Sequence, residues 1–347
     1  MIPKEHYQRA VEELRRADRV VLTTHVKPDG DAMGSLAALR RWLLAEGKRV
    51  ETIVPTPPPP RYAFLDPDGT VQVAGQDAEA AAEDPPDLVC LVDTGTWQQL
   101  AGVEAIVKGA RRVLVIDHHR TQDVPVQVAL VDAEAPATAV LVHDLLVEAG
   151  AAIDAETATY LFAGLAMDTD WFRLPTSGAE TLRLAARLVE AGAKPHLLYE
   201  QLYWNNDLAK LRLLGLAVAG LRPALGGQVM VMRLTQAMFH QTGADADDTE
   251  NLINECMKVR GAQVGVLLTD GGTGEVRVSL RSRPGTDVLG VAERFGGGGH
   301  RYAAGATLRE SLDEAESRVL KALAEVLDGG SRPAQSPGTG RRKRENA

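Results

Sequence analysis

Val113-Leu114-Val115-Ile116-Asp117-His118-His119 is the stretch of sequence that decides the fold. Four consecutive apolar residues between charged ones are typical of a strand buried on both faces of a parallel sheet. Three residues that can bind a metal ion then follow, at the point where the strand leaves the sheet. Ligands of open α/β sheets bind at the carboxyl ends of the strands. The stretch therefore predicts an α/β fold whose functional site lies at this edge of the sheet.

The same arrangement recurs at other expected strand ends. The residues concerned are His25, Asp29 and Asp31 after a strand at 19–24, Asp93 after a strand at 88–92, and Asp168 at the end of a helical or strand-like segment. Helical patterns alternate with these strands, and this alternation indicates a doubly wound, mainly parallel sheet. The carboxyl ends of its strands would collect carboxylates and imidazoles along one edge.

Each of these residues has a plainer explanation when it is taken alone. A single Asp at a strand end is more often a helix cap or a turn former, and a lone His is more often a hydrogen-bonded polar residue. The joint pattern is different, because four such motifs follow in order, each at the end of an element. Carboxylates and imidazoles without thiolates favour manganese or magnesium, with zinc or cobalt as competitors. The carboxylates outnumber the needs of one divalent ion, so we expect two ions bridged by one carboxylate.

The second half of the chain has a different pattern. Strand-like segments at 228–234, 263–269 and 275–281 surround a turn at Asp270–Gly274, which indicates antiparallel pairing. We expect a smaller C-terminal α/β domain with a mixed or antiparallel sheet, and a cleft between it and the first domain. The expected boundaries are a first domain at 1–189, a helical linker at 190–207, a second domain at 208–328 and a disordered basic tail at 329–347.

Four consecutive glycines in the second half precede a histidine and an arginine. Glycines leave backbone amides unshielded and allow positive φ, so such a segment can bind an anion. Taken alone, a flexible loop beside a solvated strand face would explain it. Beside a metal-binding domain, substrate binding is the favoured interpretation, and an arginine on the preceding strand could bind phosphate through two NH groups. The candidate substrate-binding residues are Arg281, Gly297, Gly298, Gly299, His300 and Arg301.

The bulk properties limit the class of protein. The formal net charge of -9 argues against coating long nucleic acid through bulk electrostatics, although it permits a nucleotide in a local basic pocket. The two cysteines are far apart, no apolar stretch is long enough to span a bilayer, and the amino terminus lacks the apolar core of a signal peptide. We therefore expect a cytoplasmic protein without a membrane partner. The basic run at Arg341–Arg344 could touch RNA, but such runs are more often solvated tails.

The order of these motifs resembles that of the DHH phosphoesterase superfamily. Its four motifs are matched by Thr24–Ser35, Leu91–Gly95, Ile116–His119 and Met167–Asp170. Val278–Arg281 and Phe295–Gly305 resemble the DHH-associated substrate domain. The resemblance extends over about residues 10–325, and the chain is most similar to the bacterial nano-RNase/pAp phosphatase branch.

The resemblance also implies roles for the site residues. One ion would be held by His25, Asp29 and Asp93, and the other by Asp31, Asp93, His118 and Asp168, with Asp93 as the bridge. Asp117 would orient an imidazole or the loop, and His119 would face the substrate phosphate. Arg173, just after the fourth motif, could contact phosphate or lie at the surface. The catalytic set is thus Asp93, Asp117, His118 and His119.

The activity that the resemblance implies is hydrolysis of oligoribonucleotides of a few residues to mononucleotides, and of 3′-phosphoadenosine 5′-phosphate to AMP. Manganese would be the usual ion, with magnesium or cobalt as substitutes. Short RNA or DNA oligonucleotides and small nucleotides would be the partners, and a homodimer is compatible with this assignment. Two alternatives remain open: a phosphodiesterase for linear or cyclic dinucleotides such as pApA or c-di-AMP, and a catalytically silent nucleotide-binding regulator. The intact ligand set argues against the regulator.

Overall fold

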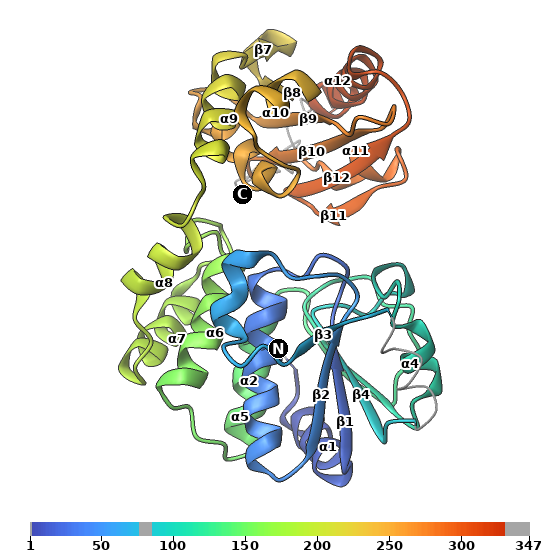
Figure 1. The fold of residues 1–347 in the computed structure, drawn as a ribbon, viewed down its shortest axis with the longest axis vertical. Coiled ribbons are helices and arrows are strands. Elements are labelled where there is room, and N and C mark those ends of the chain that lie inside the picture. The colour runs from blue at the N-terminus through green and yellow to red at the C-terminus, as the bar shows by residue number, and fades with distance from the viewer. Residues whose placement is uncertain (1, 76–84, 330–347) are drawn as a thin grey trace, which may run out of the picture. The chain divides into compact units, whose positions relative to one another are not determined.

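The computed structural model describes residues 2–75 and 85–329 (Figure 1). The chain divides into two compact units, one ending at Asn205 and the other beginning at Asn206. The range expected as a linker, 190–207, contains helix α8 (Pro195–Tyr203), whose Leu198 and Leu202 are buried in the core of the first unit. The basic run at 341–344 lies outside the described residues.

The first unit is built on a six-stranded parallel sheet, as the alternating pattern predicts. The strands follow the order β3-β2-β1-β4-β5-β6, and every pair of neighbours is parallel. Their bounds are β1 (Arg19–Thr23), β2 (Arg49–Val54), β3 (Val71–Val73), β4 (Leu88–Val92), β5 (Val113–Asp117) and β6 (Val128–Val131). Every residue of β4 and β5 is buried, which explains their unbroken apolar sequence.

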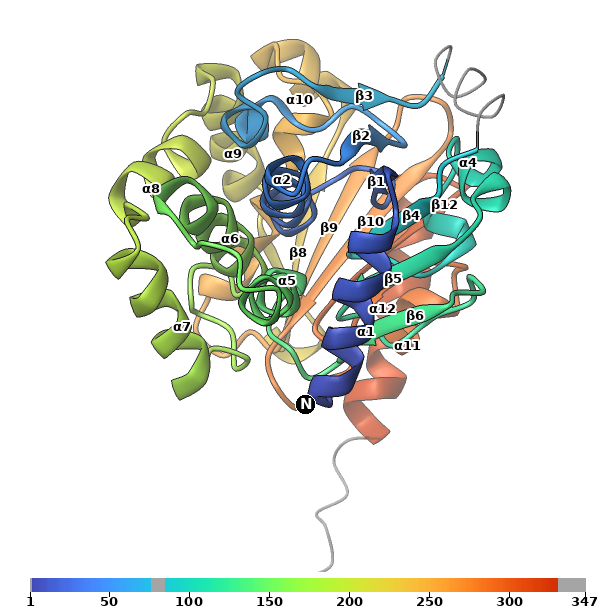
Figure 2. The same cartoon turned by 90° about the horizontal axis from the view of Figure 1, so that it is seen from below.

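Helices pack on both faces of this sheet (Figures 1 and 2). They are α1 (Lys4–Arg16), α2 (Gly30–Ala45), η1 (Pro60–Leu65), η2 (Trp97–Gln99), α4 (Glu104–Gly109), α5 (Thr138–Glu148), α6 (Ala155–Asp168), α7 (Ala179–Glu190) and α8. On one face, Val20 and Leu22 of β1 join a core with α1, α2, α5 and α6. On the other face, Val21 packs with the apolar side chains of α4.

The strand order reverses between β1 and β4. After β1 the chain adds β2 and β3 on one side, and then returns to add β4, β5 and β6 on the other side. Such a reversal leaves a crevice at the carboxyl ends of the two central strands. The loop after β1 carries His25 and Asp29, and Asp93 directly follows β4. The topology therefore brings the expected metal ligands to the reversal.

The second unit has a mixed sheet, also as predicted. Its order is β11-β12-β10-β9-β8-β7, in which β8 and β9 are parallel and the other pairs antiparallel. The strands are β7 (Arg222–Ala224), β8 (Val229–Leu234), β9 (Val264–Asp270), β10 (Val276–Ser282), β11 (Gly298–His300) and β12 (Ala303–Leu308). The helices are α9 (Leu208–Ala219), η3 (Leu225–Gly227), α10 (Gln236–Thr242), η4 (Asp247–Thr249), η5 (Leu252–Lys258), α11 (Leu289–Glu293) and α12 (Leu312–Gly329). One face of the sheet packs on α11 and α12, and the other on α9 and η5.

The two cysteines are buried and unpaired, Cys90 in β4 and Cys256 in η5. Among the helices of the described ranges, none has the length and apolar character that a membrane span requires.

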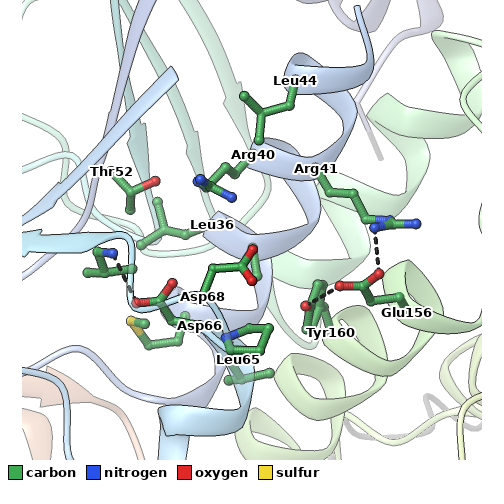
Figure 3. A pocket seen from close by; sticks show the side chains of 14 residues that line it. Leu36, Arg40, Arg41, Leu44, Thr52, Leu65, Asp66, Asp68, Glu156 and Tyr160 are labelled. Atoms are coloured by element: carbon green, nitrogen blue, oxygen red, sulfur yellow. Dashed lines mark hydrogen bonds and ion pairs between the residues drawn. The ribbon is translucent and has the colours of Figure 1, made fainter. Parts of the chain in front are cut away.

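A cavity of about 190 Å³ lies along α2 in the first unit (Figure 3). Arg41 of α2 forms ion pairs there with Asp154 (2.5 Å) and Glu156 (2.5 Å), and the Tyr160 hydroxyl donates to Glu156 (2.7 Å). These contacts fasten α2 to the start of α6. None of the lining residues belongs to the predicted site.

Candidate metal centre

Asp29 begins the site as the N-cap of α2. Its Oδ1 accepts hydrogen bonds from the amides of Asp31 (2.9 Å) and Ala32 (3.1 Å), so the residue is a helix cap as well as a candidate ligand. Gly30 opens the helix, and a Cβ there would lie 2.4 Å from the Met167 side chain. A larger residue would therefore push the end of α6, and with it the candidate ligand after Met167, away from α2.

Asp93 occupies a strained position at the end of β4. Its φ of 63° is in the left-handed region, which costs a non-glycine residue about 1–2 kcal/mol. Its amide donates to Ile116 O (2.9 Å), and its Oδ1 accepts from the Thr138 hydroxyl (2.7 Å). Backbone strain of this kind gathers at functional sites, where the surrounding structure enforces it. The Asp93 carboxylate at this strained position is buried and lies beside the rings of His25 and His118.

The carboxylates and imidazoles of the first unit form adjoining groups. In each group the possible ligand atoms lie within 4.8 Å of one another, and the groups are His25, Asp29 and Asp93; Asp31, His118 and Asp168; and Asp93, Asp117 and His119. Asp93 connects them, because its Oδ2 lies 3.4 Å from His25 Nε2 while its Oδ1 lies 3.6 Å from His118 Nε2. All eight residues predicted for the first unit thus come together.

Both candidate ligand histidines present Nε2 to the carboxylates. His25 Nδ1 donates to Val26 O (2.9 Å), and His118 Nδ1 donates to Ala135 O (3.2 Å), because a carbonyl oxygen can only accept. His118 Nε2 lies 2.9 Å from Asp168 Oδ2. A nitrogen lone pair and a carboxylate repel each other at such distances unless a proton or a metal ion lies between them. The donor set therefore fits bound cations.

The pKa values describe how the cluster behaves when only protons are present. Burial first, and then the charge of Asp93, raise the pKa of Asp29 to about 6, and burial with the same charge raises that of Asp31 well above its ordinary value. Burial alone would lower the pKa of His25, but its hydrogen bond to Asp93 and the nearby acids raise it to about 10. Burial would likewise lower the pKa of His118, but its hydrogen bond to Asp168 and the charges of the nearby acids raise it. Protons thus accumulate where several acids meet, as expected for a place that accommodates positive charge.

Asp31 is held by the start of helix α5. Its Oδ2 accepts from the Thr138 amide (2.6 Å) and its Oδ1 from the Ala139 amide (2.9 Å). A negative charge at the amino end of a helix is stabilised by unpaired amides and the helix dipole. Thr138 is not among the residues that the sequence predicts, although it lies at the start of an expected helix.

Asp117 holds His119 in place. The fully buried carboxylate accepts from the amide of His119 (3.0 Å) and from its Nδ1 (2.7 Å). Its other oxygen accepts from Gln122 Nε2 (2.5 Å), a residue that the sequence analysis missed. A Cβ at Gly95 would lie 1.6 Å from Gln122 Oε1, so the glycine of the second motif makes room for this contact. The His119 side chain is 34% exposed, against 8% for His118, which suits a role toward substrate.

Beyond Asp168 the chain makes a left-handed turn of three residues. Asp170, Trp171 and Phe172 have φ of 49°, 55° and 62°. The Trp171 ring packs edge-on against those of Tyr199 and Tyr203, which fixes the turn against α8. Arg173, considered as a phosphate contact, forms an exposed ion pair with Asp170.

In the second unit the last two of the four glycines, Gly298 and Gly299, lie in an edge strand, so this part of the segment is not a flexible loop. Strand β11 pairs with β12. A Cβ at Gly297 would lie 2.0 Å from Gly305 O, and a Cβ at Gly299 would lie 2.5 Å from Ala303 O. Glycines are required because the backbone of β12 approaches so closely.

Arg281 and His300 share one row of this sheet. Both are paired with Ala303 of β12, Arg281 from β10 and His300 from β11. Residues directly opposite one another in antiparallel strands point to the same face, and two strand spacings separate the pair by about 10 Å. Arg301 pairs with Asp287 at 3.5 Å and lies over the Tyr302 ring.

Comparison with known proteins gives two family matches. Residues 19–165 match the DHH family, N-terminal domain, and residues 226–329 match the DHHA1 domain. A bifunctional oligoribonuclease and PAP phosphatase from Thermus thermophilus is 34% identical to this chain, and the match covers 89% of this chain and 90% of the relative. A protein of the same name from Bacillus subtilis is 26% identical, and the match covers 88% of this chain and 94% of the relative. An exopolyphosphatase-related protein from Bacteroides fragilis has the same fold, with a TM-score of 0.89 at 23% identity over 96% of this chain and 99% of its own.

Proposed function

The chain belongs to the DHH family, and on that premise we propose that it hydrolyses very short oligoribonucleotides to mononucleotides and 3′-phosphoadenosine 5′-phosphate to AMP. The Thermus thermophilus relative, whose name states both activities, is similar over almost its whole length. The observation that carries the proposal is the position of Asp93 between two groups of ligand atoms. A shared carboxylate can hold two ions at the short separation that two-ion phosphoester hydrolysis uses, about 3.5–4 Å.

The proposed ligands follow the two groups. One ion would be held by His25, Asp29 and Asp93, and the other by Asp31, Asp93, His118 and Asp168. Oxygen and imidazole donors without thiolates favour manganese, with magnesium or cobalt as substitutes. Bound divalent ions supply Lewis acidity to phosphoryl oxygens and lower the pKa of water.

The remaining residues act on the substrate and on the position of the acids. Burial alone would lower the pKa of His119, but Asp117 and the charge of Asp93 raise it. The raised pKa favours the protonated form of His119, which would stabilise negative charge on the phosphoryl group or give a proton to the leaving oxygen. Asp117 and Gln122 fix the ring for this task.

The second unit is proposed to bind the rest of the substrate. The row formed by Arg281, Ala303 and His300 places a guanidinium and an imidazole on one face with a small side chain between them. Arg281 would bind phosphate, and His300 and Arg301 would contact the nucleotide. Gly297, Gly298 and Gly299 carry no side chains just before His300, so a nucleotide could approach the backbone there.

A substrate panel tests this proposal. The protein, freed of metal with EDTA and then supplied with manganese, should release mononucleotide from a labelled RNA dinucleotide and trinucleotide, and phosphate from 3′-phosphoadenosine 5′-phosphate. Phosphate release alone would restrict the function to a nucleotide phosphatase. Turnover of c-di-AMP or pApA in preference to both would favour the dinucleotide alternative. No turnover of any of them would reject the proposal.

A further inference from the structure

Thr138 contacts two acids that come from different parts of the fold. It is the first residue of α5 and is fully buried. Its backbone amide donates to Asp31 Oδ2 at 2.6 Å, and its hydroxyl donates to Asp93 Oδ1 at 2.7 Å. Asp31 belongs to the group with His118 and Asp168, whereas Asp93 belongs to the group with His25 and Asp29. One residue therefore connects the two groups.

The helix start explains the contact with Asp31. Ala137, at the N-cap position, has no side chain that could accept from the first amides of α5. Those amides need acceptors when they are buried, and the Asp31 carboxylate supplies them from another helix. Because two successive amides bind its two oxygens, the plane of the carboxylate is fixed.

The Thr138 hydroxyl orients the other acid, Asp93. Oδ1 of Asp93 lies 3.6 Å from His118 Nε2 and 3.8 Å from His119 Nδ1, while Oδ2 lies 3.4 Å from His25 Nε2. A rotation of this carboxylate would change its distances to all three rings at once. The branched Thr side chain has few χ1 rotamers in a helix, so its hydroxyl is a rigid donor that opposes such a rotation.

We propose that Thr138 is a positioning residue that sets the spacing of the two metal ions, through its amide on Asp31 and its hydroxyl on Asp93. The inference rests on the proposed function, because it concerns the same metal centre. Thr138 would act on the ions only through the carboxylates of Asp31 and Asp93, to which it donates. Its effect should therefore be visible in metal binding before any substrate is added.

Three substitutions separate the two contacts. Thr138→Ser keeps the amide and the hydroxyl. Thr138→Val keeps the shape and the amide but loses the hydroxyl. Thr138→Pro loses both donors, although proline is accepted at the first position of a helix, and the extended backbone of Ala137 (φ -167°, ψ 153°) is one that precedes proline readily.

The experiment is calorimetric titration of manganese into the full-length, EDTA-treated protein. Loss of a partner behind a metal ligand weakens metal affinity by about 10–100-fold. We expect Thr138→Ser to bind like the wild type, Thr138→Val to bind weaker by this factor, and Thr138→Pro weaker still. Thr181→Val is the matched control, because it removes a buried threonine hydroxyl that donates to Thr176 O (2.9 Å) outside the metal groups. Its manganese affinity should stay at the wild-type value.

Electron paramagnetic resonance gives the second readout. Two manganese ions at a fixed short distance give an exchange-coupled spectrum, which should persist in Thr138→Ser and change in Thr138→Val. The inference is overturned if Thr138→Val binds two ions with wild-type affinity and spectrum, or if Thr138→Ser is as impaired as Thr138→Val. Wild-type protein that binds no manganese would instead reject the proposed metal centre, and the inference with it. If Thr138→Pro does not fold, the comparison of Ser with Val decides alone.

Discussion

His25 should release a proton when a metal ion binds beside it. Its Nδ1 already donates to Val26 O, so the proton that leaves is on Nε2, 3.4 Å from Asp93 Oδ2. The neighbouring acids, acting against burial, raise the pKa of His25 to about 10. At pH 7.5 the gap of about 2.5 pH units corresponds to about 3 kcal/mol, which ion binding must supply to remove the proton.

The sign of the pH dependence follows. Protons compete with the ion below the pKa of His25, so manganese affinity should rise with pH, by about tenfold per pH unit for each proton displaced. The pKa of His118 is also raised, so protons compete with the ion at the neighbouring group as well. Below about pH 6, Asp29 holds a further proton and should weaken binding again.

Calorimetry in two buffers measures this release directly. Manganese is titrated at pH 7.5 in HEPES and in Tris, whose heats of ionisation differ, and the difference in heat gives the number of protons released. His25→Gln should release about one proton fewer than the wild type. His143→Gln is the control, because His143 is also buried beside an acid, Asp144, but lies outside the metal groups. Equal heats in the two buffers for the wild type would refute the reasoning.

Three further predictions concern other residues. Asp93→Asn should abolish turnover of every substrate and prevent binding of two ions, because both groups lose their shared carboxylate; near-normal kcat would contradict this. His300→Ala should raise KM for short RNA while leaving hydrolysis of bis-p-nitrophenyl phosphate unchanged, and equal losses on both would argue against a role in nucleotide binding. Gly95→Ala should lower kcat as much as Gln122→Ala, because its Cβ, 1.6 Å from Gln122 Oε1, displaces that side chain from Asp117. The double variant should then be no worse than either single one, whereas additive losses would show two separate effects.

The sequence predicts the parallel sheet and the meeting of the strand-end acids for a physical reason. Apolar runs such as Val113–Ile116 mark buried parallel strands, and the rule for reversed strand order brings their carboxyl ends together. The acids at those ends could therefore be placed in one site without coordinates. The antiparallel hairpin around Asp270–Gly274 was equally predictable from its turn residues, and β9 and β10 confirm it.

The sequence does not predict the residues that act through tertiary contacts. Thr138 lies 107 positions from Asp31 and 45 from Asp93, so no local pattern relates them. Gln122 reaches Asp117 only because Gly95 leaves space for it. Glycine is unfavourable in strands, so the sequence gives no sign that the segment before His300 belongs to a strand. Its pairing with β12 depends on a backbone approach that only the folded sheet creates.

The most direct test of the account is to count bound manganese and measure turnover in one titration. Metal-free protein receives increasing manganese, bound ions per chain are quantified, and hydrolysis of an RNA dinucleotide is recorded at each point. The account predicts that turnover rises with the second ion bound per chain, because Asp93 serves both groups. Full turnover with a single ion per chain, or no turnover with two, would contradict it.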